Sequence, residues 1–193
     1  MTFEQYEMYK EQIHELIVAD YFSKYWKGKP MQFDLSGENL INKVNNLLPD
    51  SVLDVGCGYN EYKNNIKSNK FVGIDPYNDS ADIKVGIEDY QTDEQYDVVL
   101  VLGSINFGSS EKIMREFDAV DKLTKKGGHI FVRVNPGITH THTDYPLINL
   151  IEFYPWTEQA IQTIADIHGY QILELEEETN RTGDKRLFFH YYK

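Results

Sequence analysis

The 193-residue sequence has a single cysteine, Cys57, so no disulfide bond can form within the chain. It also lacks a long apolar stretch. Its longest uninterrupted aliphatic run is Val98–Leu102, far short of the ~18 apolar residues that a membrane-spanning helix requires. Residues 1–15 are acidic and broken by charges, which is atypical of a secretory signal peptide. We therefore expect no membrane segment and a location in the reducing cytoplasm.

Basic residues are also scarce. The chain has 19 Lys and Arg against 31 Asp and Glu, and its formal net charge is -12. A surface of this sign repels phosphate backbones and anionic membranes at long range, which argues against nucleic acid as a partner. The hydrophobic content of 41% and the charged content of 26% are near the average for globular proteins, so intrinsic disorder is excluded.

Four segments carry the apolar spacing of three and four residues that predicts amphipathic helices. The third of these helices is expected to end at the glycines of Lys125–Gly128. The fourth begins after a capping Thr157 and stops at Gly169. The four segments are residues 3–25, 37–47, 109–122 and 157–168.

Seven short apolar segments predict strands, and they alternate with helices or short crossovers. This alternation favours a parallel sheet covered on both faces, while the loop before the last strand favours an antiparallel pair. We expect an α/β fold with three α/β/α layers and a seven-stranded, mostly parallel sheet whose last strand is antiparallel. One domain would span residues 1–193, with helices in 1–48 packed on a core of 49–193. The strands are expected at residues 51–55, 70–74, 82–85, 96–102, 130–134, 170–176 and 185–192.

The first segment that indicates chemistry is Val52–Tyr62, VLDVGCGYNEY. An apolar strand delivers Asp54, and Gly56 and Gly58 then make a tight turn. Glycine is needed where φ is positive or where a ligand lies against the backbone. A turn at the carboxyl end of a first parallel strand also exposes backbone N–H groups to a ligand. The alternative is a plain strand-to-helix turn without a ligand.

A second segment, FVGIDPYN, ends the next strand at Asp75, 17 residues after Gly58. A carboxylate at this position accepts hydrogen bonds from both hydroxyls of a ribose in nucleotide-binding folds. The alternative is a turn formed by an Asp-Pro pair. Two further observations argue against a phosphate-bearing ligand. Glu61 occupies the third small position of a dinucleotide site, where it would repel a pyrophosphate. The G-K-[ST] of a phosphate-binding loop occurs nowhere in the sequence.

These segments together resemble the class I S-adenosylmethionine-dependent methyltransferases, over about Gly37 to the C-terminus. Asn60 stands at the family's third glycine position, and Asn tolerates the left-handed backbone that such a turn needs. The resemblance implies the Rossmann-like methyltransferase fold and S-adenosylmethionine as cofactor. Five matches occur in the family's order: VLDVGCG, FVGIDPYN, residues 85–89, YDVVLVLGSINF and LTKKGGHIFVRV.

The resemblance also implies roles for single residues. Asp54 would face the aminopropyl end of the cofactor, and the turn after it would lie under the ribose and methionine portions. Aromatic residues in 21–26, at the end of the first helix, would either wall the substrate pocket or pack in the core. The full set of expected cofactor-binding residues is Asp54, Gly56, Cys57, Gly58, Asp75, Pro76, Ile87, Glu88, Gly103 and Ser104.

Candidates on the acceptor side are fewer. Asn106 lies in the fourth motif, and His140, His142 and Tyr145 lie in the irregular segment 135–156. The alternation of His140, His142 and Asp144 also allows a metal site, but the donor is a sulfonium that needs no Lewis acid, so we expect no metal. Neither the D/N-P-P-Y/F tetrapeptide of amino-methylating DNA enzymes nor a cysteine nucleophile is found, and no catalytic residue is assigned.

The sequence therefore predicts a cytoplasmic S-adenosylmethionine-dependent methyltransferase. Its acceptor is expected to be a small molecule, given the acidic surface and the small size of the chain. Alternatives are a methyltransferase-like binding or scaffold protein without turnover, and a methyltransferase that acts on protein or nucleic acid. A nucleotide-linked oxidoreductase is disfavoured by Glu61.

Overall fold

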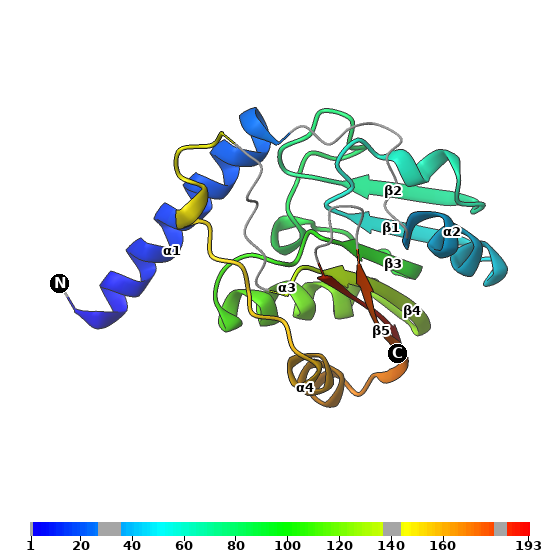
Figure 1. Ribbon diagram of the computed structural model, residues 1–193. Coiled ribbons are helices and arrows are strands. Elements are labelled where there is room, and N and C mark those ends of the chain that lie inside the picture. Colours follow the sequence, from blue (N-terminus) through cyan, green and yellow to red (C-terminus); the bar gives the residue numbers. More distant parts are fainter. Residues whose placement is uncertain (1, 27–35, 137–143, 180–184) are drawn as a thin grey trace.

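A mixed sheet of six strands forms the centre of the computed structural model, which describes residues 2–26, 36–136, 144–179 and 185–193 (Figure 1). The strand order is β2-β1-β3-β4-β6-β5. The first four of these strands are parallel, and β6 runs antiparallel to both β4 and β5. The strands are β1 (Ser51–Val55), β2 (Lys70–Ile74), β3 (Tyr96–Leu102), β4 (Thr124–Val134), β5 (Gln171–Thr179) and β6 (Lys185–Tyr192).

The expected third strand, at residues 82–85, is not formed. Only Ile83 pairs with β2, through an isolated parallel bridge to Ile74. The Val85 N–H bonds to the Ile83 carbonyl at 3.1 Å, which turns the chain after one paired residue, and Ile83 remains 42% exposed. The α/β fold class is confirmed, but with six strands in the described residues instead of the seven predicted.

The expected glycine stop after the third helix was also wrong. Helix α3 (Ser110–Leu123) passes directly into β4, whose first residue, Thr124, pairs with Tyr96 of β3. The Gly127 N–H bonds to the Lys193 carbonyl at 2.7 Å. Thr124 pairs with β3, and after a register shift His129 pairs with both β3 and β6, so long-range pairing takes the segment 124–129 into β4. A local glycine signal does not reveal such pairing.

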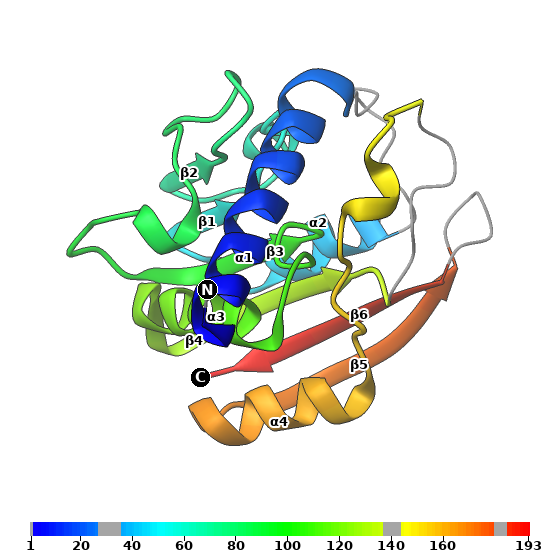
Figure 2. The same ribbon diagram turned by 90° about the vertical axis from the view of Figure 1, so that its left-hand side faces the viewer.

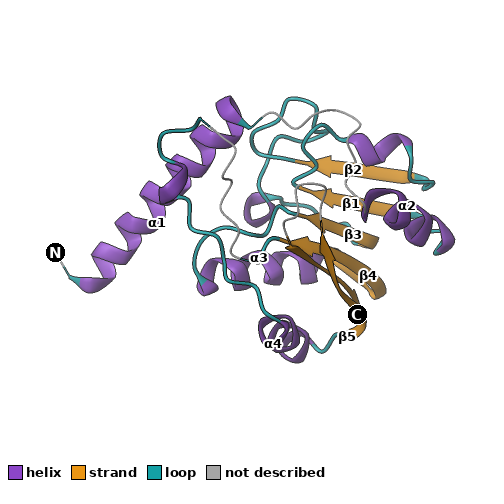
Figure 3. Ribbon diagram, viewed as in Figure 1, coloured by secondary structure: helices purple, strands orange, loops and turns teal. Residues whose placement is uncertain are grey.

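Helices cover both faces of the sheet (Figure 3). Leu40 and Val44 of α2 (Ser36–Asn46) pack against Val52 of β1 on one face. Helices α3 and α4 (Glu158–His168) cover the other face, where Leu53 and Val55 point. Successive strand residues alternate between the two cores, and this confirms the predicted three layers. Ser109 and Thr157 cap α3 and α4, as expected for the fourth helix.

The N-terminal helix lies across the carboxyl ends of the parallel strands (Figures 1 and 2). Helix α1 (Phe3–Asp20) continues as the single π-helical turn η1 (Tyr21–Tyr25). Val18 and Tyr21 are buried here against Phe107 and Tyr145. Such π-helical turns are rare and are often found at functional sites. Short 3-10 turns complete the fold: η2 (Glu61–Asn64), η3 (Ile87–Asp89) and η4 (Ile148–Leu150). Across the described ranges, no helix has the length and apolar character needed to cross a membrane.

Candidate functional site

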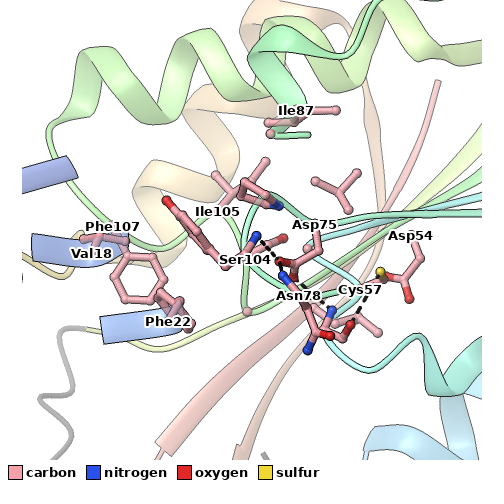
Figure 4. A pocket seen from close by; sticks show the side chains of 18 of the residues that line it. Val18, Phe22, Asp54, Cys57, Asp75, Asn78, Ile87, Ser104, Ile105 and Phe107 are labelled. Carbon is pink, nitrogen blue, oxygen red and sulfur yellow. Dashed lines mark hydrogen bonds between the residues drawn. The ribbon is translucent and has the colours of Figure 1, made fainter. Parts of the chain in front are cut away.

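A cavity of about 530 Å³ opens where the parallel strands end. Its floor consists of the loops after β1, β2 and β3, and α1 with η1 forms the opposite wall. In Figure 4, Asp54, Cys57 and Asp75 lie at one end, while Phe22 and Phe107 lie at the other. The carboxyl edge of a parallel sheet is the position at which α/β proteins bind ligands.

The glycine turn after β1 is closely packed. Gly56 has φ +68, and a Cβ built there would lie 2.3 Å from the Ser104 Cβ. Gly58 has φ +53, and its Cβ would lie 3.2 Å from the ring of Trp26. The Gly56 and Cys57 N–H groups both bond to the Ile74 carbonyl, at 2.8 and 3.0 Å. The turn thus needs glycine at position 56 for backbone conformation and for its contact with the loop after β3.

Asn60 supports the same turn. It has φ 58, in the left-handed region that was expected for the family's third glycine position. Its amide nitrogen donates to Asp82 at 3.2 Å and to the Ser80 carbonyl at 3.3 Å. These bonds hold the left-handed residue in place, so the substitution of glycine by Asn60 preserves the turn.

Asp75 connects the loops after β1 and β2. Its Oδ2 accepts from the Gly58 N–H at 3.0 Å, and its Oδ1 accepts from the N–H groups of Tyr77 and Asn78 at 2.8 and 2.9 Å. A carboxylate has about four acceptor sites, and three of them are used here. Asp75 is therefore a turn residue and also a cavity residue with one acceptor site to offer.

Asp54 lies at the base of the cavity and is only 2% exposed. Its Oδ2 is buried without a hydrogen-bond partner. Burial, and then the negative charge of Asp75, raise the pKa of Asp54 to about 7. A buried carboxyl oxygen of this kind is costly unless a donor reaches it, so the geometry suits a ligand that brings a donor.

Two other residues of the floor have simpler surroundings. Burial, followed by the charges of Asp54 and Asp75, raises the pKa of the Cys57 thiol. The thiol is therefore protonated at neutral pH and is a poor nucleophile. The Ser104 Oγ is buried and unpartnered, and it lies beside the Gly56 turn.

Most of the cofactor residues expected from the sequence come together in this cavity. The exception is Glu88, which lies on η3 and accepts a hydrogen bond from the Arg115 Nε at 2.9 Å. It lines a neighbouring hollow outside the main cavity. The residues that line the main cavity are Asp54, Gly56, Cys57, Gly58, Asp75, Pro76, Ile87, Gly103 and Ser104.

The acceptor-side candidates are placed differently. Asn106 is fully buried, and its Oδ1 accepts from the Asn135 N–H at 3.1 Å. The Tyr145 hydroxyl donates to the Ile17 carbonyl at 3.2 Å. Neither side chain is among the residues that line the cavity. His140 and His142 lie outside the described residues, and the part of the chain that is described contains no group of three His, Cys, Asp or Glu able to hold a metal.

The structure also brings in residues that the sequence did not single out. His14 and Glu15 of α1, Glu116 of α3, Arg133 of β4 and Arg186 of β6 all line the cavity. For Glu116 a signal was present, because it follows Ile113 by three residues and precedes Val120 by four, on the apolar stripe of its helix. The arginines lie on strands that are far apart in the sequence, so no local pattern could have paired them.

The aromatic residues at the end of the first helix divide between the core and the cavity. Tyr21 packs in the core, whereas Phe22 and Trp26 line the cavity. Phe22 stacks on Tyr77 with ring centroids 5.9 Å apart, and Trp26 stacks on Tyr59 at 5.7 Å. The cavity therefore has an apolar aromatic wall opposite its polar floor.

Solved structures of methyltransferases share this architecture. The N-methyltransferase NodS from Bradyrhizobium japonicum WM9, in complex with S-adenosyl-L-homocysteine, is 13% identical; the match covers 95% of this chain and 98% of that one, with a TM-score of 0.65. The magnesium protoporphyrin IX methyltransferase of Synechocystis PCC 6803, with bound S-adenosylmethionine, is 15% identical over 93% and 97%, with a TM-score of 0.65. A Burkholderia thailandensis 1,6-didemethyltoxoflavin-N1-methyltransferase is 11% identical over 97% and 89%, also at 0.65.

These likenesses define the fold. The chain has the Rossmann-like fold of the class I S-adenosylmethionine-dependent methyltransferases, which confirms the fold that the sequence resemblance implied. No protein-family model and no curated protein matches the sequence.

Proposed function

We propose that this protein is a cytoplasmic S-adenosylmethionine-dependent methyltransferase that methylates a small molecule. The observation that carries the proposal is the pair of carboxyl groups in one cavity, Asp54 at the end of β1 and Asp75 at the end of β2. The fold supports it, because structures with this architecture contain S-adenosylmethionine or S-adenosylhomocysteine.

The residues present fit this cofactor. The unpartnered Asp54 Oδ2 is an acceptor for the ammonium group of the methionine portion. Asp75 has one acceptor site left for a ribose hydroxyl. Pro76 and Ile87 offer apolar surfaces to the adenine ring. The remaining floor consists of backbone and small side chains that would lie under the ligand: Gly56, Cys57, Gly58, Gly103 and Ser104.

The same cavity does not suit a phosphate-bearing nucleotide. Glu61 lines it, as do Asp54 and Asp75. Carboxylates repel a pyrophosphate. The basic residues that line the cavity, Lys112, Arg133 and Arg186, lie on α3, β4 and β6 and not on the glycine turn, and Lys112 is bound to Glu15. In addition, the Gly56 and Cys57 N–H groups are both used by the Ile74 carbonyl. The site thus favours a ribose ligand with a positively charged tail over NAD or ATP.

Methyl transfer places modest chemical demands on the chain. When bound, S-adenosylmethionine supplies a methyl group that its positive sulfur already activates. The protein's task is then to align the acceptor with that methyl and to exclude water. Phe22, Trp26 and Phe107 provide the apolar wall for this purpose. We assign no general base, and His140 and His142 stay proposed acceptor-side residues.

A small-molecule acceptor is supported by the size and nature of the cavity. Its opposite wall is aromatic, and its volume is about 530 Å³. Two of the solved methyltransferases with this fold are named for small-molecule acceptors, a didemethyltoxoflavin and a magnesium porphyrin. The net charge of -12 disfavours nucleic acid.

Calorimetric titration with S-adenosylmethionine, S-adenosylhomocysteine, NAD and ATP tests the proposal. We expect the first two to bind and the last two not to bind. The holoprotein is then incubated with a metabolite extract, and release of S-adenosylhomocysteine together with a mass increase of one methyl group identifies the acceptor. Binding of NAD without S-adenosylmethionine would refute the proposal, and cofactor binding without turnover on any acceptor class would support a scaffold function.

A further inference from the structure

Glu116 is an ionisable residue on the inward side of α3. It lines the cavity together with Pro76, Tyr77, Gly86 and Ile87. It also borders the neighbouring hollow with the same four residues, so it lies at the boundary between the two. This is the end of the cavity to which the proposed cofactor brings its adenine ring.

The carboxyl group of Glu116 has no hydrogen-bond partner on its buried oxygen. The Oε2 atom is buried and makes no hydrogen bond. Burial is the main cause that raises the pKa of Glu116 to about 8, and the charge of Lys112 partly opposes it. The group is therefore mostly a neutral carboxylic acid at pH 7, with one O–H donor and one carbonyl acceptor.

The charged groups around Glu116 are engaged with one another. Lys112, one turn earlier on α3, bonds to Glu15 of α1 at 2.8 Å. Arg115 bonds to Glu88 of η3 at 2.9 Å and also pairs with Glu11 of α1. These contacts join α1, α3 and η3 around the end of the cavity, and none of them uses Glu116.

Glu88 is the residue that the sequence resemblance assigns to the adenine, but its carboxylate is bound to Arg115. Its side chain is 34% exposed and does not line the main cavity. A carboxylate in an ion pair is also an acceptor only. It therefore lacks the donor that the N1 atom of adenine requires.

We propose that Glu116, and not Glu88, recognises the adenine edge, with its carbonyl oxygen accepting from the N6 amino group and its O–H donating to N1. This inference rests on the proposed cofactor. The neutral acid supplies both the donor and the acceptor that this edge of adenine needs. An ionised Glu116 would instead place a negatively charged oxygen against the lone pair of N1, and the two would repel each other. In this arrangement, a protonated carboxyl group on α3 recognises adenine by hydrogen bonding.

The test measures the binding of S-adenosylhomocysteine by calorimetry to wild type, Glu116→Gln, Glu116→Ala and the control Glu88→Gln. Near pH 7 we expect Glu116→Ala to bind about tenfold more weakly, from the loss of two neutral hydrogen bonds. Glu116→Gln, whose amide carries the same donor and acceptor, should stay within about twofold of wild type. Glu88→Gln should also stay within about twofold, because it loses only a partly exposed ion pair.

The pH dependence separates this role from a purely structural one. Ionisation of Glu116 removes its donor, so wild-type affinity should fall by about tenfold more than that of Glu116→Gln between about pH 7 and about pH 9. The amino group of the ligand titrates in the same way with both proteins, so the difference between wild type and Glu116→Gln reports the ionisation of Glu116 alone. Thermal unfolding checks that the variants fold. If Glu116→Ala does not fold, the pH profile of Glu116→Gln compared with that of wild type decides the question.

Each other outcome overturns the inference. Equal affinity of Glu116→Ala and wild type would show that Glu116 does not touch the base. A large loss in Glu88→Gln with none in Glu116→Ala would return the role to Glu88. Identical pH profiles of wild type and Glu116→Gln would exclude the protonated acid. If wild type binds no S-adenosylhomocysteine at all, the proposed function fails as well, so the two failures are distinguishable.

Discussion

The Asp75 carboxylate and the Gly58 backbone N–H are joined by a hydrogen bond of 3.0 Å. The same carboxylate accepts from the N–H groups of Tyr77 and Asn78, so one side chain holds the glycine turn and its own turn together. Because the cavity lies between these two turns, its shape depends on a residue that also lines it.

Asp75→Ala is therefore expected to lose both stability and binding. Buried N–H groups left unpaired cost about 1–3 kcal/mol each, and the variant leaves three backbone donors without their carboxylate. We expect the free energy of unfolding to fall by about 2 kcal/mol or more and the affinity for S-adenosylhomocysteine to fall at least about tenfold. Thermal unfolding and calorimetry measure the two effects. Lost binding with unchanged stability would show that the loops do not depend on Asp75.

Gly56→Ala should be far more destabilising than Gly86→Ala. A Cβ at position 56 meets the Ser104 Cβ at 2.3 Å in a left-handed backbone, whereas a Cβ at position 86 has no atom within 4 Å. We expect a loss of about 2–4 kcal/mol for the first and a change within about 0.5 kcal/mol for the second. Chemical denaturation of both variants provides the comparison. Similar stability of the two would contradict the close contact of the β1 and β3 loops.

Asp54→Asn should raise stability at neutral and alkaline pH while weakening cofactor binding. The pKa of Asp54 is raised from 3.8 to about 7 by burial and by Asp75, so the folded state holds its proton more tightly than the unfolded chain. The free energy of unfolding contributed by this group therefore falls as the pH rises from about 4 to about 7. At pH 8 the ionisation of buried Asp54 lowers the free energy of unfolding of the wild type by up to about 4 kcal/mol, and the Asn variant does not have this loss.

Unfolding curves of wild type and Asp54→Asn at about pH 5 and about pH 8 check this difference. The stability gained by the variant should be larger at the higher pH. Its affinity for S-adenosylhomocysteine should drop by about tenfold, since a charged acceptor for the ammonium group is lost. A variant that is less stable than wild type at both pH values would contradict the assigned protonation.

Trp26 should report ligand binding through its fluorescence. Its ring lies over Gly58 and stacks on Tyr59, whereas the second tryptophan, Trp156, is 3% exposed in the core. A ligand that enters the cavity changes the surroundings of Trp26 only. We expect S-adenosylhomocysteine to shift the emission of wild type and of Trp156→Phe, but not that of Trp26→Phe. A response that persists in Trp26→Phe would place the ligand elsewhere.

Periodicity and local motifs predicted much of this protein from the sequence. The four helices and the run of residues 96–102 follow from apolar spacing, which depends only on near neighbours along the chain. The turn at Gly56 and the left-handed Asn60 follow from backbone sterics in the same way. The resemblance of five ordered motifs then placed the expected cofactor site at the ends of β1, β2 and β3.

Contacts between distant segments decided the rest. One bridge at Ile83 did not extend into a strand, and pairing with β3 and β6 drew the segment 124–129 into β4. Glu88 is bound to Arg115 and does not line the main cavity, whereas α3 packs against η3 and Glu116 lines the cavity together with Ile87. Local patterns predict helices, strands and turns from neighbouring residues. The burial, charge pairing and protonation of the site residues depend on contacts between α1, α3 and the ends of the strands, which form only in the tertiary structure.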